Sequence, residues 1–455
     1  MMLVIMFSYH NYFKGKKITV VRVGLLGRGI GDTAYLAEAG AEVTVVDAAS
    51  AEVMQPAVDQ LKQYPDITWK FGPYDFADFK EADLVLVGAG TPLEEPVLVQ
   101  CREAGVKLTQ SAALFAELSG IPIIGITGTR GKSTVTMMIH HVLSVVTGEE
   151  IILGGNIRGV SNLQLLKQVK EDSIAVMELD SWQLQGFGWA KLSPQVAVFT
   201  SFMPDHLNYY MQGGKAEEEA MQLYFEDKAN IFRYQRESDV FITTPEVFER
   251  AKTISGVTLG QEVILADTSV IPEDALLAMP GEHNRLNAAL AYEALHALSL
   301  TDEEIFSGLA SFSGVEGRLQ YLGEQDGVKI YNDNNATTPE ATAAGLRAVG
   351  NIDDKNVILV AGGSDKQLDT KALEEEIGKY CKKICWLSGT GTEKILPKVG
   401  GEVFNSLAEA VAAGLASGQS GDVLLFSPAF ASFGKYKNEY ERNDEFLSII
   451  NNKEA

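Results

Sequence analysis

The chain has 455 residues, of which 46% are hydrophobic and 22% are charged, a composition typical of a folded protein and not of a disordered one. This length exceeds what one hydrophobic core supports, so we expect two or three domains. With 38 lysine and arginine residues against 61 aspartate and glutamate residues, the net charge of −23 argues against a surface that binds nucleic acid or an anionic membrane. The net charge does not exclude a small nucleotide bound in a local basic pocket.

Cysteine content and the absence of leader signals favour the cytoplasm. Cys101, Cys381 and Cys385 are too few for a disulfide framework, and no second Cys/His pair completes a zinc site, so we expect reduced thiols. The apolar residues 1–10 are followed, not preceded, by lysines and lack a small-residue cleavage site, so we expect no signal peptide. No run of 18 apolar residues predicts a membrane span.

Strand-like and helix-like segments alternate at the start of the chain. A β-branched run at 18–26 ends in a glycine cluster, a helical stretch extends to residue 40, and strands are expected at 41–48 and 83–90. Such alternation is typical of a parallel sheet with helices on its faces. We predict a Rossmann-like first domain over residues 1–117.

A second block begins with a strand at 121–127, which leads into a glycine loop and a helix start. Buried strands are expected at 173–179 and 195–202, and residues 286–298 have the apolar spacing of an amphipathic helix. We predict a central domain over 118–316 whose mostly parallel sheet is like that of the P-loop ATPases.

The last block contains strand-like runs separated by helical stretches, and the runs lie at 327–333, 356–363, 383–389 and 422–428. This pattern predicts a second Rossmann-like domain over 317–455. The predicted fold class is therefore α/β, in three consecutive domains.

The most specific motif is GITGTRGKST at 125–134. A glycine loop between a strand and a helix lets backbone N–H groups surround phosphate oxygens, and the helix N-terminus adds positive charge. Lys132 would neutralise phosphate charge, and the Ser133 hydroxyl could reach Mg²⁺. The spacing G-x-x-G-x-x-G-K-S differs from the strict Walker pattern, and the alternative interpretation is a glycine turn with a surface lysine.

This loop resembles the ATP-binding loop of the Mur ligases, which form amide bonds in peptidoglycan precursors. The resemblance continues from the first glycine cluster to KYKNEYERNDEF at 435–446, and it is closest to the members that add D-glutamate. The ATP contacts that it implies are Gly128, Thr129, Gly131, Lys132, Ser133, Thr134, Asn284, Asn287, Arg318 and Asp333.

Two of these contacts have a second interpretation. Asn284 and Asn287 lie one helical turn apart, and the resemblance implies that their amides read the edge of adenine. Taken alone, such a pair is more typical of helix capping. For Arg318 and Asp333 the resemblance implies contacts to phosphate and to the ribose or the domain hinge.

The resemblance also implies a magnesium site in the central block. Its ligands would be Ser133, Glu178 at the end of a strand, His206 after another strand, and Lys228. Oxygen and imidazole ligands at strand ends are suited to a cation beside phosphates. Lys228 matches a lysine that is carbamylated in the family and so becomes an anion. Taken singly, Glu178 would be a solvated strand end, His206 a core or cap histidine and Lys228 an exposed helix lysine.

Substrate contacts follow from the same resemblance. Gly27, Arg28, Gly29 and the strand-end Asp47 look like a weak dinucleotide fingerprint, G-x-G-x-G, which the family uses for the uridine diphosphate of its substrate. Asn156 matches a second contact to this substrate. A dicarboxylate needs a cation with hydroxyl and backbone donors, and the residues matched to the D-glutamate pocket are Thr337, Lys366, Ser432 and Phe433.

The chain departs from the family pattern at several positions. Arg130 stands where the family usually has asparagine or lysine, Asn335 replaces a lysine, and Glu439 stands at the position of an aromatic residue. The segment between His206 and Lys228 is also longer. A related ligase that adds another amino acid, such as L-glutamate, therefore stays an alternative.

The resemblance implies a cytoplasmic ligase that joins UDP-N-acetylmuramoyl-L-alanine to D-glutamate with ATP and Mg²⁺ through an acyl phosphate. We expect a monomer with small-molecule partners and no nucleic-acid or membrane partner. Two other classes are weighed against it. An NAD-dependent dehydrogenase built on the loop at Gly27 has no use for Lys132, Glu178 and Lys228, and a non-catalytic nucleotide-binding protein would not need the metal ligands.

Overall fold

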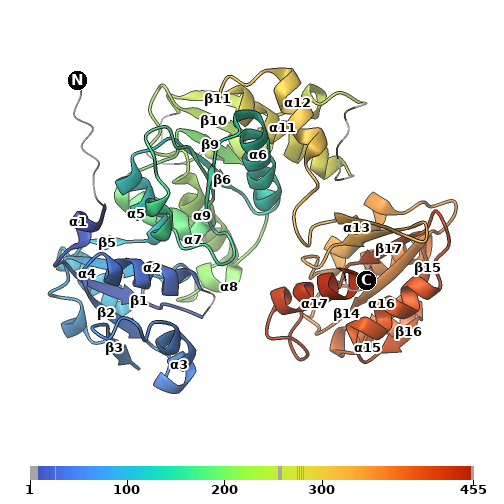
Figure 1. The fold of residues 1–455 in the computed structure, drawn as a ribbon, viewed down its shortest axis with the longest axis horizontal. Helices are drawn as coiled ribbons and strands as arrows, with labels where there is room; N and C mark the ends of the chain where they lie inside the picture. Colours follow the sequence, from blue (N-terminus) through green and yellow to red (C-terminus); the bar gives the residue numbers. More distant parts are fainter. Residues whose placement is uncertain are drawn as a thin grey trace. The chain divides into compact units, whose positions relative to one another are not determined.

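The computed structural model describes residues 9–25, 27–254, 259–273, 275, 277, 279 and 281–451. The chain divides into two compact units, the first formed by residues up to 272 with 286–308 and the second by 273–285 with 309–455. The first unit holds two parallel sheets and the second holds one mixed sheet (Figure 1). The predicted three-domain α/β fold class is confirmed.

The N-terminal sheet is parallel throughout, with the strand order β3-β2-β1-β4-β5 in the described residues. Its strands are β1 (Lys17–Val21), β2 (Glu42–Asp47), β3 (Thr68–Phe71), β4 (Leu84–Val87) and β5 (Leu108–Thr109). The helices of this part are α1 (Tyr9–Phe13), α2 (Arg28–Glu38), α3 (Ala51–Gln60), η1 (Phe76–Asp78), α4 (Pro96–Glu103) and α5 (Ser111–Ser119).

Alternate residues of β1 face opposite sides of this sheet. Ile18 and Val20 pack in one core cluster with residues of α2 and α5, whereas Val21 packs in another with residues of α4. Both faces are thus covered, which explains why the strands are almost continuously apolar. The strand predicted at 18–26 ends earlier, at Val21, because Arg22 has a left-handed backbone (φ 55°) that breaks the extended pairing.

The central sheet has the order β11-β10-β9-β6-β8-β7, and every pairing in the described residues is parallel. Its strands are β6 (Ile123–Thr127), β7 (Ile152–Gly155), β8 (Ala175–Glu178), β9 (Val196–Phe199), β10 (Val240–Thr243) and β11 (Glu262–Leu265). The sequence analysis named β6, β8 and β9 but not β7, β10 or β11, which are four residues each.

Helices connect these strands as parallel pairing requires. The connecting helices are α6 (Lys132–Thr147), η2 (Gln164–Lys167), α7 (Ser181–Ala190), α8 (Leu207–Tyr210), α9 (Glu217–Ala229) and α10 (Pro245–Ala251). Three more helices follow β11, and they are η3 (Thr268–Val270), α11 (Glu282–His296) and α12 (Asp302–Ser311). The carboxyl ends of β6, β8 and β9, with the loops and helices that follow them, carry the glycine loop and the predicted metal ligands.

The C-terminal sheet has the order β12-β13-β17-β14-β15-β16, in which only β12 is antiparallel among the described strands. Its strands are β12 (Gln320–Gln325), β13 (Val328–Asn332), β14 (Val357–Gly362), β15 (Cys381–Leu387), β16 (Glu402–Phe404) and β17 (Val423–Phe426). Core clusters on both faces join it to α13 (Pro339–Val349), α14 (Lys371–Tyr380), α15 (Thr390–Val399), α16 (Leu407–Ala416) and α17 (Glu439–Asn451).

Two expectations concern membranes and the start of the chain. None of the helices that the structure describes combines the length and the apolar character needed to cross a bilayer. The expectation that residues 1–10 form no signal peptide concerns mainly residues 1–8, which lie outside the described residues.

Candidate active site

The glycine loop after β6 has the predicted strand–loop–helix form. Gly131 caps α6 with a left-handed backbone (φ 86°), and Gly128 has φ 146°. A Cβ at Gly128 would lie 2.0 Å from the Thr200 hydroxyl oxygen, so no other residue fits there. The Nζ of Lys132 donates hydrogen bonds to the carbonyl oxygens of Gly128 and Thr129, at 3.0 and 3.3 Å. The lysine thus lies over the loop, where phosphate charge would be neutralised.

The segment after β9 fixes this loop. The Thr129 N–H donates to the carbonyl of Ser201 at 2.7 Å, and its hydroxyl accepts a bond from the N–H of Met203 at 3.0 Å. The Arg130 N–H donates to the Ser201 hydroxyl at 2.9 Å. These bonds satisfy loop groups from the neighbouring strand end, so the loop holds its shape by contacts within this unit. The side chain of Asn287 also lies against the loop, since a Cβ at Gly131 would meet its Oδ1 at 2.5 Å.

Lys228, on α9, is buried, which excludes the interpretation as an exposed helix lysine. Its side chain is almost fully covered, with 1% of the residue exposed. The Nζ donates to the carbonyl oxygen of Gly128 at 2.9 Å and to the Thr127 hydroxyl at 3.3 Å, and it lies 4.9 Å from the Tyr224 ring centroid. Burial, aided by the charge of Lys132, lowers the pKa of Lys228 well below its usual range.

His206 lies beside the glycine loop at the start of α8. Its backbone is left-handed (φ 53°), and its ring centroid is 4.7 Å from that of Trp182. Burial lowers the pKa of His206, and the charge of Lys228 acts in the same direction, while Asp205 opposes the change. The Asp205 carboxylate in turn pairs with the Arg130 guanidinium at 3.1 Å. A neutral imidazole is the form that could ligate a metal.

Glu178, at the end of β8, is linked to the N-terminal sheet through one side chain. The Nδ2 of Asn156 donates to Glu178 Oε1 at 3.2 Å, and the Oδ1 of Asn156 accepts from Arg28 Nη1 at 2.6 Å. Two predicted substrate residues and one predicted metal ligand are thus brought together, although 150 positions separate Arg28 from Glu178 in the numbering (178 − 28). Only 4% of Glu178 is exposed.

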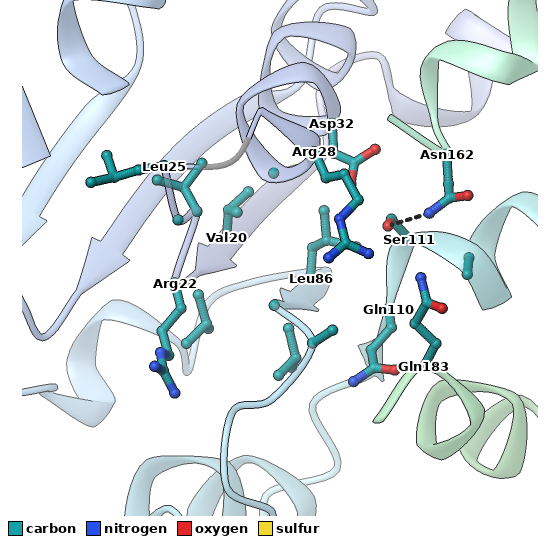
Figure 2. Close-up of a pocket in the computed structure, with 18 residues that line it drawn as sticks. Val20, Arg22, Leu25, Arg28, Asp32, Leu86, Gln110, Ser111, Asn162 and Gln183 are labelled. Atoms are coloured by element: carbon teal, nitrogen blue, oxygen red, sulfur yellow. Dashed lines mark hydrogen bonds between the residues drawn. The ribbon is translucent and has the colours of Figure 1, made fainter. Parts of the chain in front are cut away.

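A pocket lies beside the first glycine cluster (Figure 2). Its lining includes Arg28 and Gly29 from α2, the ends of β1 and β4, and side chains from 110–111 and the central part of the unit. Gly29 lets the start of α2 lie close to the segment that follows β1, because a Cβ at Gly29 would lie 2.1 Å from the Val23 carbonyl oxygen. Asp47, at the end of β2, is buried and accepts from the N–H of Ala49 at 3.0 Å, and it does not line this pocket.

The second unit places the remaining predicted residues in separate groups. Asp333 is buried and accepts from the Leu319 N–H at 3.1 Å and the Ser427 hydroxyl at 2.8 Å. Burial raises the pKa of Asp333 to about 7, opposed by these bonds and by the charge of Arg318. Asn284 is buried in the same unit.

The predicted amino-acid residues fall into two pairs. The Lys366 Nζ donates to the Thr337 hydroxyl at 2.9 Å. Ser432 and Phe433 line a different pocket, after β17, which also includes Thr390; the first pair does not line it. Ser432 is buried, whereas the Phe433 side chain is mostly exposed.

Several side chains around these groups were not predicted. Trp182 packs on His206. Asp227 accepts bonds from Gln185 and Tyr210, at 2.8 and 2.9 Å. Asp32 is a buried residue of α2. Tyr224 had a usable signal, since it lies four residues before Lys228 and so on the same helix face. The sequence offers no such signal for Trp182, Asp227 or Asp32, because the residues that they contact come from distant segments.

Comparison with known proteins decides the family. Family models of the Mur ligases match three stretches: the MurD-like N-terminal domain at 16–110, the middle domain at 126–247, and the glutamate ligase domain at 317–430. The UDP-N-acetylmuramoylalanine–D-glutamate ligase of Roseiflexus sp. (strain RS-1) is 31% identical over 473 residues, which cover 96% of this chain and 98% of the relative. The chain belongs to the Mur ligase family. The ligase of the same name from Acetivibrio thermocellus is 32% identical, covering 98% of this chain and 99% of its own.

Solved structures agree with this Mur ligase in fold. MurC, the UDP-N-acetylmuramate–alanine ligase of Thermotoga maritima, has a TM-score of 0.56 at 17% identity and covers 96% of this chain and 100% of its own. MurF of Thermotoga maritima, solved with ADP, has a TM-score of 0.54 at 14% identity and covers 98% and 97%.

Proposed function

We propose that this protein is an ATP-dependent ligase that joins the amine of D-glutamate to the alanine carboxylate of UDP-N-acetylmuramoyl-L-alanine. The observation that carries the proposal is the similarity to ligases of that name over 96–98% of the chain, together with a glycine loop that holds Lys132 over its carbonyls. We place the three substrates on predicted domains 1–117, 118–316 and 317–455.

The proposed reaction has two steps, a phosphoryl transfer from ATP and an attack by the amine. The alanine carboxylate oxygen attacks the γ-phosphorus of ATP, and the bond to the β-phosphate oxygen breaks, which yields ADP and an acyl phosphate. The D-glutamate amine attacks the acyl carbon, loses a proton, and expels inorganic phosphate to leave the amide. Lys132 and the N-terminus of α6 lower the energy of the charge that develops on the transferring phosphoryl group.

The central residues fit a magnesium ion in part. Glu178 and Ser133 offer hard oxygen donors, and a neutral His206 offers a nitrogen. Among the described residues no three His, Cys, Asp or Glu side chains form a metal-holding group. The few donors from Glu178, Ser133 and His206 are compatible with Mg²⁺, which commonly takes one or two protein ligands and completes its shell with phosphate and water. When bound, the ion would screen the charge of the phosphates.

We infer that Lys228 works as a carbamate. As an ammonium it would add positive charge beside Lys132, in a place where 1% of the residue reaches solvent. The lowered pKa supplies the neutral amine that reacts with CO₂; loss of one proton leaves a carbamate anion. An anionic oxygen at this position would complement a cation at Glu178 and His206.

The sugar nucleotide and the amino acid are assigned to separate groups. The pocket at Arg28 and Gly29, with Asn156 beside it, suits the uridine diphosphate part, because a guanidinium and a helix N-terminus favour phosphate. Lys366 with Thr337 would hold a carboxylate of the amino acid, and Ser432 would add a donor. A monomer in the cytoplasm stays a prediction of the sequence.

One experiment tests the reaction directly. Phosphate release is measured with ATP, Mg²⁺, UDP-N-acetylmuramoyl-L-alanine and D-glutamate, and again with each one omitted. Release that requires all four, with the amide product found by mass spectrometry, supports the proposal. Release with L-glutamate in place of D-glutamate would reassign the amino acid, and release without any amino acid would contradict a ligase.

A further inference from the structure

Asp32, an acidic residue of α2, lies in the interior of the first unit. Only 3% of it is exposed. Its Oδ1 accepts one hydrogen bond from the Ser161 hydroxyl at 2.6 Å and another from the N–H of Leu163 at 3.0 Å. Both donors belong to the segment 156–163, which follows β7 of the other sheet. The carboxylate therefore joins a helix of the N-terminal sheet to a loop of the central sheet.

The helix and the loop are in direct contact at this point. A Cβ at Gly31 would lie 2.6 Å from the Cβ of Ser161, so any larger residue would force the two segments apart. The Nε2 of Gln164 also donates to the Gly31 carbonyl oxygen, at 3.2 Å. Asp32 is thus placed beside this close contact, where a small displacement of the loop would break both of its bonds.

The same loop begins with the side chain that links two proposed ligand sites. Asn156 uses its Oδ1 to accept from Arg28 and its Nδ2 to donate to Glu178. Arg28 lies four residues before Asp32, on the same face of α2. One helix therefore holds the segment 156–163 at both of its ends, through Arg28 at the start and Asp32 near the finish. Figure 2 shows Arg28 and Asp32 side by side at the pocket wall.

We propose that Asp32 is a positioning residue, which fixes the segment 156–163 so that Asn156 holds Arg28 and Glu178 in their working places. The inference rests on the proposed function, because Arg28 and Asn156 are assigned there to the sugar nucleotide and Glu178 to magnesium. Without the carboxylate, a buried hydroxyl and a buried N–H lose their acceptor. The segment then moves toward water, and Asn156 loses one or both of its bonds.

The first test compares Asp32→Ala with Asp32→Asn. Asparagine keeps an Oδ1 that can accept from both Ser161 and Leu163, whereas alanine keeps no acceptor. For the alanine variant we expect kcat/KM for the sugar nucleotide to fall about 10- to 100-fold, as for other residues that orient ligands indirectly. We expect the asparagine variant to stay within about 3-fold of the wild type. Equal loss in both variants, or no loss in either, would overturn the proposal.

A double-mutant cycle with Asn156→Ala separates positioning from general stability. If Asp32 acts through Asn156, then Asp32→Ala lowers kcat/KM little once Asn156 is already alanine. Additive losses would show that Asp32 supports the fold and not this contact. Should Asp32→Ala fail to fold, Ser161→Ala serves in the same cycle, with a smaller loss expected because the bond from Leu163 remains.

A matched control uses the same helix and the same neighbouring segment. Lys167, in η2, forms an exposed ion pair with Glu38 of α2, at 2.5 Å. Lys167→Ala removes this link without touching the segment 156–163, and we expect kcat/KM to be unchanged. A loss as large as that of Asp32→Ala would mean that any loosening of the two segments impairs activity.

Hydrogen exchange distinguishes a failure of this inference from a failure of the proposed function. The Leu163 amide should be protected in the wild-type protein and in Asp32→Asn, and should exchange at least about tenfold faster in Asp32→Ala. This measurement needs no substrate, so it holds even if the wild type releases no phosphate. Equal protection of Leu163 in all three proteins would refute the positioning role.

Discussion

The Nζ of Lys228 donates a hydrogen bond to the carbonyl oxygen of Gly128 at 2.9 Å, although 100 residues separate them in the chain. This contact places a buried lysine side chain against the loop proposed for ATP. It links α9 to the carboxyl end of β6 and makes Lys228 testable as part of the site.

Lys228→Ala should lose about two orders of magnitude or more in activity, because the proposed carbamate, an anionic metal ligand, is lost. Added acetate should restore part of the activity by occupying the vacated position. With ¹³C-labelled bicarbonate, the wild-type protein should show a carbamate signal that this variant lacks. Lys252→Ala, at an exposed pair with Glu249, is the control and should be unaffected. If Lys228→Ala retains most of its activity, Lys228 is not a metal ligand.

Lys132→Ala should keep the fold and lose phosphate release. The loss of charge neutralisation at the transferring phosphoryl group costs about 3–5 kcal/mol in the transition state, which is two to four orders of magnitude in kcat. Circular dichroism checks the fold, and Lys215→Ala, on an exposed loop, is the control. Near-normal phosphate release would contradict the assignment of the loop.

Lys366→Ala should raise the KM for D-glutamate strongly, by about tenfold or more, with the KM for the sugar nucleotide little changed. The reason is that only the amino acid loses a partner for its carboxylate. Lys371→Ala, which removes an exposed lysine of the same unit, should change neither constant. Comparable increases in both KM values would indicate a general defect and not a lost contact to the amino acid.

Asp333 should make the stability of the second unit depend on pH. Its pKa is about 7 in the folded unit, whereas an unfolded aspartate titrates near 3.9. Its contribution to the free energy of unfolding is therefore fully present below about pH 4 and is lost as the pH rises through about 7, on the order of 4 kcal/mol in all. Asp333→Asn resembles the protonated form, so its stability should fall less between pH 5 and 8.

The buried Trp386 reports the unfolding of this unit by urea once the three other tryptophans are changed to phenylalanine. Asp326→Asn, at an exposed turn, should leave the pH dependence as in the wild type. If Asp333→Asn loses stability with the same slope as the wild type, Asp333 is ionised throughout this range.

Local patterns were enough for the elements that bear the phosphate loop. The apolar run at 121–127 predicts β6, which begins two residues later, at Ile123. The helix expected after the glycine loop is present as α6, which begins at Lys132. By contrast, β1 stops at Val21 because the backbone of Arg22 turns left-handed, and nothing in a β-branched run announces such a turn.

The amino-acid sequence by itself determined the α/β class, the order of the three sheets and the glycine loop, since these depend on residues that are close in the chain. Only the tertiary structure decided that Lys228 is buried, that Asn156 joins Arg28 to Glu178, and that Asp32 is an interior acceptor. An aspartate on a helix is expected at the surface, and it lies inside here because two donors from a distant loop meet its carboxylate. Such pairings depend on how two sheets pack, and no local period encodes that.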